Sequence, residues 1–251
     1  MQHPWHRFVA LGDSFTEGYG DPDPASPGGL RGWADRVADV LGATTDGFAY
    51  ANLAVRGRLL GRIVDEQVEP AVALAPDLIT ISAGGNDVIR PGADPDRIAA
   101  RLDAAMGRLT GTGATVVLFT GVDVGFSPVF RHIRGRVAIY NELLRGIAAR
   151  HGALVADQWN LASIQRADFW CADRLHLNPS GHHEVARMVL ATLGVENDLQ
   201  PMAPAPLPPR TWREARAEDL VWTRQHLMPW VGRRIRGVSS GDHVPPKRPG
   251  F

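Results

Sequence analysis

The feature that most constrains the fold is a series of short, almost wholly apolar segments that alternate with longer amphipathic ones. Apolar runs predict five buried strands, at residues 8–11, 48–55, 78–82, 115–120 and 153–156. Helical spacing of apolar residues predicts helices at 33–41, 59–74, 94–109, 133–151 and 178–193. Strands of this kind, alternating with helices, are typical of a parallel sheet covered on both faces. We therefore predict an α/β protein with three layers, α/β/α, and a five-stranded parallel sheet.

Polar residues follow several of these strands. Ser14 comes after the first strand, Gly57 after the second and Asn86 after the third. Asp173 and His176 follow the fifth strand in one long loop. Right-handed crossovers bring the carboxyl ends of parallel strands to one edge of the sheet. We expect these five residues to converge there.

The five residue types together supply what acyl transfer needs. His176 could take the proton of the Ser14 hydroxyl, and Asp173, three positions earlier, could fix its tautomer. The backbone N–H groups of Ser14 and Gly57 and the side-chain amide of Asn86 could stabilise an oxyanion. The pattern predicts a Ser14–His176–Asp173 triad with an oxyanion hole at Ser14, Gly57 and Asn86.

Each of these residues also has an ordinary structural interpretation. Ser14 and Glu17 fit a capping box at the start of a helix. Gly57 fits a turn with positive φ, and Asn86 fits a turn or a helix cap. The catalytic interpretation depends on all strand ends offering the required residue type in one chain.

Four sequence blocks resemble those of a known family. Residues 11–15 read Leu-Gly-Asp-Ser-Phe, residues 52–57 Asn-Leu-Ala-Val-Arg-Gly, residues 84–87 Gly-Gly-Asn-Asp, and residues 173–176 Asp-Arg-Leu-His. In this order they resemble the conserved blocks of the SGNH hydrolases, the GDSL-type esterases and lipases, with Phe15 where the family name has Leu. The resemblance covers about residues 7–194.

The resemblance implies a flavodoxin-like α/β/α fold and serine esterase or lipase activity without a metal or other cofactor. It places the nucleophile on Ser14, the further oxyanion donors on Gly57 and Asn86, and the acid and base on Asp173 and His176. The expected substrate is a small-molecule or lipid-like acyl ester. Lipid esters, acetylated sugars and thioesters all remain compatible with the sequence, which also does not indicate an oligomeric state.

Two other functions compete with this hypothesis. In a metal-dependent phosphoesterase, the five side chains of Asp13, Asp87, Asp173, His176 and His182 would gather around one or two cations. Ligands from the end of the fourth strand are sparse, which disfavours it. A non-catalytic binding module on the same fold is the second alternative, and the complete set of catalytic residue types argues against it.

Composition restricts the partners and the compartment. The 27 basic and 27 acidic residues balance, so nucleic acid is not an expected partner. A single cysteine, Cys171, allows no internal disulfide, which suits a reducing compartment. The sequence shows neither a signal peptide nor an apolar run long enough to cross a bilayer. We expect a cytoplasmic protein.

The last fifty residues differ in character from the rest. We predict a hydrolase domain at residues 1–197, a proline-rich linker at 198–210, and a basic, tryptophan-containing helix with a tail at 211–251. Pro229 should kink or end this helix, and the tail from residue 239 should be loosely ordered. Packing of the helix on the hydrolase domain is favoured over contact with an anionic membrane, because three tryptophans rarely stay in water.

Overall fold

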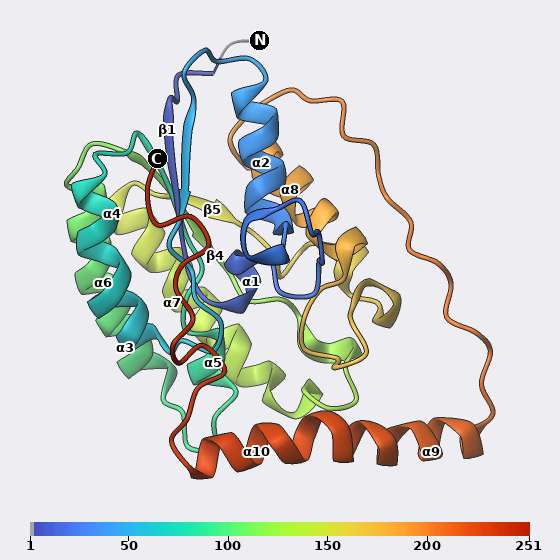
Figure 1. The fold of residues 1–251 in the computed structure, drawn as a ribbon. Helices are drawn as coiled ribbons and strands as arrows, with labels where there is room; N and C mark the ends of the chain where they lie inside the picture. Colours follow the sequence, from blue (N-terminus) through green and yellow to red (C-terminus); the bar gives the residue numbers. More distant parts are fainter. Residues whose placement is uncertain (1–2) are drawn as a thin grey trace.

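The computed structural model describes residues 3–251 and contains one sheet of five parallel strands between two layers of helices (Figure 1). The strand order is β2-β1-β3-β4-β5. The strands are β1 (Arg7–Leu11), β2 (Ala49–Asn52), β3 (Leu78–Ile81), β4 (Thr115–Phe119) and β5 (Leu154–Ala156). The predicted three-layer α/β/α fold is confirmed.

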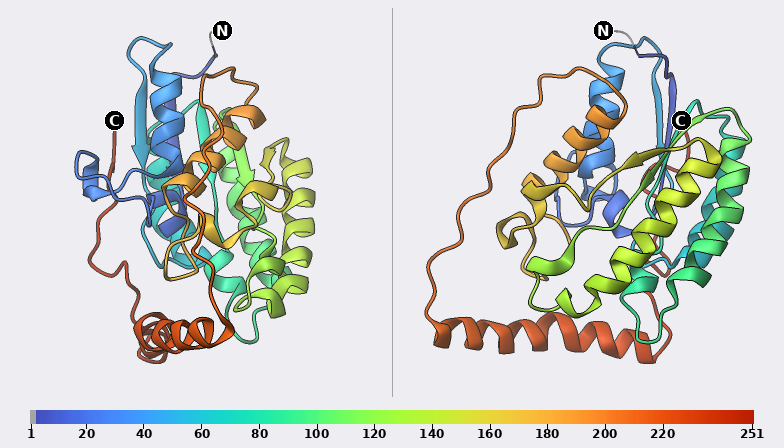
Figure 2. Two further views of the ribbon diagram at one scale, coloured as in Figure 1. Left: turned by 90° about the vertical axis from the view of Figure 1, so that its right-hand side faces the viewer. Right: turned by 180° about the vertical axis from the view of Figure 1, so that it is seen from behind.

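The alternation of side chains along β1 explains why both faces of the sheet are covered. Val9 and Leu11 enter one apolar core, whereas Phe8 and Ala10 enter the other, and all four are fully buried. One layer contains α3 (Leu60–Ile63), α4 (Glu69–Ala73), α6 (Pro95–Thr110) and α7 (Arg134–His151). The opposite layer contains α2 (Gly32–Gly42) and α8 (Pro179–Thr192) (Figure 2).

Two short helices begin directly after the central strands. They are α1 (Ser14–Glu17), which follows β1, and α5 (Gly85–Val88), which follows β3. β1 pairs with both β2 and β3, so the direction in which the strands are added reverses between β1 and β3. This switch point is where ligands bind in open α/β sheets. Both short helices therefore begin at the expected edge.

Two prolines in predicted helices are accommodated by wider turns. A π-helical turn, Val64–Val68, separates α3 from α4 and ends just before Pro70. A second, Thr223–Leu227, separates α9 (Trp212–Trp222) from α10 (Met228–Ile235) and ends just before Pro229. A π-turn shifts the hydrogen-bond pattern at the point where proline has no N–H to donate. The helix containing Pro229 consequently continues to Ile235.

We call residues 212–235 the arm, residues 236–251 the tail, and residues 3–199 the body. An exposed proline-rich segment, 201–210, leads away from α8, and the arm then crosses beneath the body (Figure 1). The arm contacts the body where the Trp222 indole N–H donates to the Asp173 carbonyl at 3.0 Å. Arg174 lies over the Trp222 ring and forms an ion pair with Asp219 at 2.7 Å.

The outer side of the arm leaves large apolar side chains in solvent. Trp212, Leu220 and Met228 are each more than 60% exposed. In residues 3–251, no helix has both the length and the apolar character that crossing a bilayer requires. Peripheral contact of the arm with a membrane stays the untested alternative to packing on the body.

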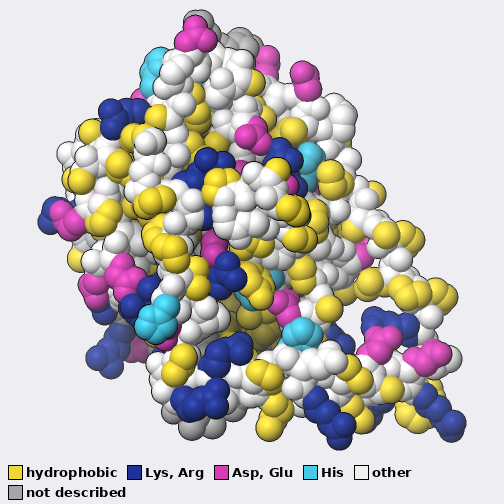
Figure 3. Space-filling model, in the orientation of Figure 1, with side chains coloured by type: hydrophobic (Ala, Val, Ile, Leu, Met, Phe, Trp, Pro, Cys, Tyr) yellow, Lys and Arg dark blue, Asp and Glu magenta, His cyan; other side chains and the backbone are white. Residues whose placement is uncertain are grey.

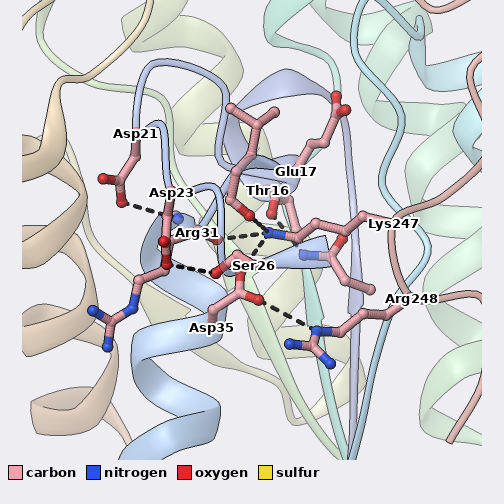
Figure 4. A network of polar contacts seen from close by, with 12 residues as sticks. Thr16, Glu17, Asp21, Asp23, Ser26, Arg31, Asp35, Lys247 and Arg248 are labelled. Carbon is pink, nitrogen blue, oxygen red and sulfur yellow. Dashed lines mark hydrogen bonds and ion pairs between the residues drawn. The ribbon is translucent and has the colours of Figure 1, made fainter. Parts of the chain in front are cut away.

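The tail returns along the body and is held there, unlike the loosely ordered tail expected from its composition. The Lys247 ammonium is only 3% exposed and donates to the Leu30 and Arg31 carbonyls at 3.0 and 2.6 Å. It also pairs with the buried Asp35 carboxylate (Figure 4). Beside it, Arg248 and Asn52 exchange two backbone hydrogen bonds. A buried charge in its own pocket fixes the tail in one register.

Replacing Lys247 with methionine tests this attachment. Lys247→Met leaves the Asp35 carboxylate buried with only Arg248, at 3.4 Å, as a charged partner. Breaking a buried pair costs roughly 3–5 kcal/mol, and the tail can avoid that cost by detaching. The Asn52 amide, which donates to the Arg248 carbonyl at 2.9 Å, should then exchange with solvent at least about 100-fold faster by NMR. An unchanged exchange rate of the Asn52 amide in Lys247→Met would contradict the prediction. The control is Arg213→Met, at an exposed residue of the arm, which should keep the exchange rate of the wild type.

Candidate active site

The turn after β1 is shaped by a glycine and held by a glutamine. Gly12 has φ +155, and a Cβ there would lie 2.5 Å from Thr16 Oγ1 and 2.8 Å from the Ser82 carbonyl oxygen, so no larger residue fits. The buried Gln67 side chain accepts from the Gly12 N–H at 2.8 Å and donates to its carbonyl at 2.9 Å. Gln67 lies in the π-helical turn before Pro70. This turn therefore supports the strand end that carries Ser14.

The cap of α1 is Asp13 and not Ser14, to which the alternative structural interpretation assigned that role. The Asp13 carboxylate accepts from the Phe15 N–H at 3.1 Å. Glu17, which a capping box would turn back to Ser14, instead points to Arg56 and accepts from its backbone N–H at 2.8 Å. The Ser14 hydroxyl is consequently not used as a helix cap.

Ser14, His176 and Asp173 form one continuous line of hydrogen bonds. Ser14 Oγ lies 3.0 Å from His176 Nε2, and His176 Nδ1 lies 2.6 Å from Asp173 Oδ2. The other Asp173 oxygen accepts from the Leu175 and His176 backbone N–H groups, each at 3.0 Å. Burial alone would raise the pKa of Asp173, but these hydrogen bonds and the His176 ring hold that pKa below its usual value. The carboxylate is thus ionised at neutral pH.

The imidazole is also positioned by its neighbours. The centre of the Tyr19 ring lies 4.5 Å from the centre of the His176 ring. The Arg56 guanidinium lies over the Tyr19 ring, 4.9 Å from its centre. Glu17 binds Arg56 through both carboxylate oxygens. No role was predicted for Tyr19 or Arg56. Arg56 lies within the sequence block at 52–57, next to Gly57, which is a signal that could have indicated it, whereas Tyr19 lies outside all four blocks.

Two of the three predicted oxyanion donors make no other hydrogen bond among the described residues. Within residues 3–251, the Ser14 N–H and the Gly57 N–H have no acceptor. Gly57 has φ +72, and its neighbour Arg56 is fixed by Glu17. The Asn86 amide, in contrast, donates to Asp13 Oδ2 at 2.8 Å and to the Arg58 carbonyl at 3.1 Å. Asn86 would have to exchange one of these acceptors for an oxyanion.

Two cavities meet at Ser14. The first, of about 190 Å³, runs into the body and is lined mainly by apolar side chains. The second, of about 570 Å³, lies between the body, the arm and the tail. Ser14, Asn86 and His176 line both cavities. A group bound in either cavity would therefore lie next to the Ser14 hydroxyl.

The side chains proposed for a metal centre do not gather. Throughout the part of the chain that is described, no group of three or more His, Cys, Asp or Glu side chains is arranged to hold a metal ion. Asp13 binds Asn86, and Asp173 binds His176. His182 is fully buried in α8 with Nε2 3.2 Å from the Tyr19 carbonyl, and burial lowers its pKa to about 4. His182 is a structural residue.

The fold, and the polar residues at the carboxyl ends of its parallel strands, are those of a class of hydrolytic enzymes. More particularly, the chain belongs to the GDSL-like lipase/acylhydrolase family, whose model matches residues 10–184. It is a carboxylic ester hydrolase of the SGNH type. No curated protein matches the sequence.

Solved structures of esterases share the fold. LAE5, an α/β hydrolase enzyme from the metagenome of Lake Arreo, Spain, is 23% identical with a TM-score of 0.64, covering 76% of this chain and 96% of that one. Axe2, an acetylxylan esterase from Geobacillus stearothermophilus, is 19% identical with a TM-score of 0.62, covering 76% and 95%. EstA, a psychrotrophic esterase from Pseudoalteromonas sp., is 17% identical with a TM-score of 0.60, covering 75% and 97%. At these identities the likeness concerns the fold alone.

Burial of Asp13 gives the stability of the protein a specific pH dependence. Desolvation raises the pKa of Asp13 to about 6, although the Phe15 N–H and the nearby His176 act in the opposite direction. Between about pH 4 and pH 6 the folded state then binds more protons here than the unfolded state, so the free energy of unfolding falls as pH rises. The contribution of this group amounts to about 3 kcal/mol.

We expect Asp13→Asn to remove this fall. Urea unfolding of the wild type and the variant, at several pH values from 4 to 7, measures the difference in slope. Asp46→Asn, at an exposed carboxyl group, should keep the slope of the wild type. An identical decline in the Asp13→Asn protein would show that Asp13 is not its source.

Proposed function

We propose that the protein cleaves carboxylic esters through an acyl-enzyme formed on Ser14. The observation that carries the proposal is the line of hydrogen bonds from Ser14 Oγ to His176 Nε2, 3.0 Å, and from His176 Nδ1 to Asp173, 2.6 Å. In this geometry Nδ1 carries the proton that Asp173 accepts, so Nε2 has a free lone pair facing the hydroxyl. His176 is the general base, and Asp173 orients it and stabilises its charged form.

The two half-reactions follow from these positions. As Ser14 Oγ attacks the acyl carbon, its proton passes to His176 Nε2, which then donates it to the departing alcohol. Water next enters the vacated position, gives a proton to His176 and attacks the acyl carbon. The bond between the acyl carbon and Ser14 Oγ then breaks, Oγ takes the proton back from His176, and the acid is released. The charge that develops on the acyl oxygen meets the free N–H groups of Ser14 and Gly57, with Asn86 as the third donor.

The smaller cavity provides the binding site for the acyl group. Its lining is apolar and continuous with the core between the sheet and α7, and includes Ile89, Phe119, Val124, Phe130, Ile133 and Val137. Such a surface gains free energy from each methylene that it removes from water. We infer an apolar acyl chain longer than acetyl as the preferred acyl group.

Substitution of the nucleophile tests the mechanism directly. Ser14→Ala should lower kcat/KM for 4-nitrophenyl esters by about 10⁴-fold or more, and a fluorophosphonate probe should label the wild type at Ser14 only. Asn86→Ala should lower kcat by roughly 10²–10³-fold, because one oxyanion donor is lost. Ser180→Ala, at a serine outside the site, is the matched control.

The same assays separate the proposal from the two alternatives. Activity that disappears with a chelator but persists in Ser14→Ala would favour the metal-dependent phosphoesterase. A folded wild-type protein that neither hydrolyses esters nor reacts with the probe would favour the binding module.

The acyl pocket predicts a dependence on chain length. From acetyl to hexanoyl 4-nitrophenyl esters, each added methylene should raise kcat/KM by about fourfold, from about 0.8 kcal/mol per buried methylene, until the cavity is filled. Val124→Phe, which narrows the cavity, should move the optimum to shorter chains. Val221→Phe, on the exposed side of the arm, should leave it unchanged. A wild-type preference for acetyl would refute an extended acyl site.

A further inference from the structure

The larger cavity is a chamber made by two distant parts of the chain. The body contributes Arg56, Arg62 and Arg90, and the arm contributes Trp222, Trp230 and Arg233. The tail closes one side, where a Cβ on Gly57 would lie 2.4 Å from Ser239 Oγ and 2.8 Å from Ser240 Oγ. The arm and tail therefore form walls of the chamber that begins at Ser14.

Part of the positive charge in this chamber is already paired. Arg56 binds the buried carboxylate of Glu17. Arg62 binds Glu66 and, at 3.1 Å, Asp242 of the tail. These two arginines fix the site loop and the tail, so their charges are largely compensated.

Arg90 and Arg233 are different. Both line the chamber, Arg233 partly buried and Arg90 exposed, yet within residues 3–251 neither guanidinium has an ion-pair or hydrogen-bond partner. Arg90 follows α5 on the body, whereas Arg233 lies on α10, so the two charges come from opposite walls. Of the acidic side chains that line the chamber, Asp173 is bound to His176 and Asp242 to Arg58 and Arg62. Two positive charges thus remain without a counter-charge.

Figure 3 shows Lys and Arg side chains on both sides of the boundary between arm and body, next to a hollow. A partly desolvated guanidinium without a partner, such as that of Arg233, is unfavourable, and an anion that reaches both Arg233 and Arg90 gains charge-assisted hydrogen bonds. Guanidinium groups match the geometry of phosphate and carboxylate oxygens. The chamber is therefore better suited to an anionic group than to a neutral one.

We propose that this chamber binds the alcohol part of the ester and that this part carries a phosphate or carboxylate group held by Arg90 and Arg233. The inference rests on the proposed function, because it takes Ser14 as the nucleophile and the apolar cavity as the acyl site. The alcohol then lies on the side of His176 from which it receives its proton. Arg90 and Arg233 are specificity-determining residues, and the arm supplies one of them.

Esters that differ only in the charge of the alcohol test the proposal. The substrates are 1-butanoylglycerol, 1-butanoylglycerol 3-phosphate and 3-butanoylglycerate, with butanoate release as the readout. The wild type should prefer an anionic ester over the neutral one by about tenfold or more in kcat/KM, as expected for a hydrogen bond between charged groups. Comparison of the phosphate with the carboxylate shows which anion the chamber selects.

Single variants locate the preference. Arg90→Gln and Arg233→Gln should each reduce the ratio of anionic to neutral kcat/KM by about tenfold, mainly through KM. Arg224→Gln, on the same arm but outside the chamber, removes the same charge and should keep the ratio of the wild type. A ratio near one in the wild type, or an equal fall in all three variants, would overturn the inference; the latter would indicate long-range attraction only.

A binding measurement keeps the test independent of turnover. Calorimetry should detect glycerol 3-phosphate or glycerate, but not glycerol, binding to the full chain, and Arg90→Gln or Arg233→Gln should weaken it by about tenfold. Anion binding without Ser14-dependent hydrolysis would refute the proposed function and leave the anion site intact. Hydrolysis of neutral esters without anion binding would refute only the anion site.

Discussion

The pair of hydrogen bonds between the Gln67 side chain and the backbone of Gly12 is the interaction on which the rest of the site depends. The chain must leave β1 through a position where only glycine fits, and both polar groups of that position are buried and need partners. Gln67 supplies both. With the turn fixed, Asp13 caps α1 and the Ser14 N–H has no acceptor of its own. A structural requirement at residue 12 thus leaves a donor available for chemistry at residue 14.

Much of this arrangement follows from the sequence. The five apolar strands, their parallel order and the convergence of Ser14, Asn86 and His176 at one edge depend on local pattern and on the handedness of crossovers, both of which the sequence carries. The path of the arm does not follow in that way. It depends on contacts such as Trp222 with Asp173, 49 residues apart, and nothing in the spacing of either residue indicates the other.

Local misreadings have similar causes. Ser14 with Glu17 has the spacing of a capping box, but the Glu17 carboxylate binds Arg56 instead. The residue before Ser14, Asp13, is the cap. The composition of the tail suggested a loosely ordered segment. Lys247 in its pocket with Asp35 is one of several contacts that hold it, and composition does not record which side chain has a buried partner. In both cases a tertiary contact overrides a local preference.

Lys247 and Asp35 are 212 positions apart in the chain, and this separation gives the protein an order of assembly. A ribosome adds roughly 5–20 residues each second, so all residues of the Ser14–His176–Asp173 line are made several seconds before Lys247. The body can fold and bring its reactive groups together while the wall formed by the arm and tail does not yet exist. Under the two proposals made above, hydrolytic competence would therefore precede selectivity during synthesis. A newly made molecule would then pass through an interval in which Ser14, the proposed nucleophile, is open to solvent on the side that the arm later covers.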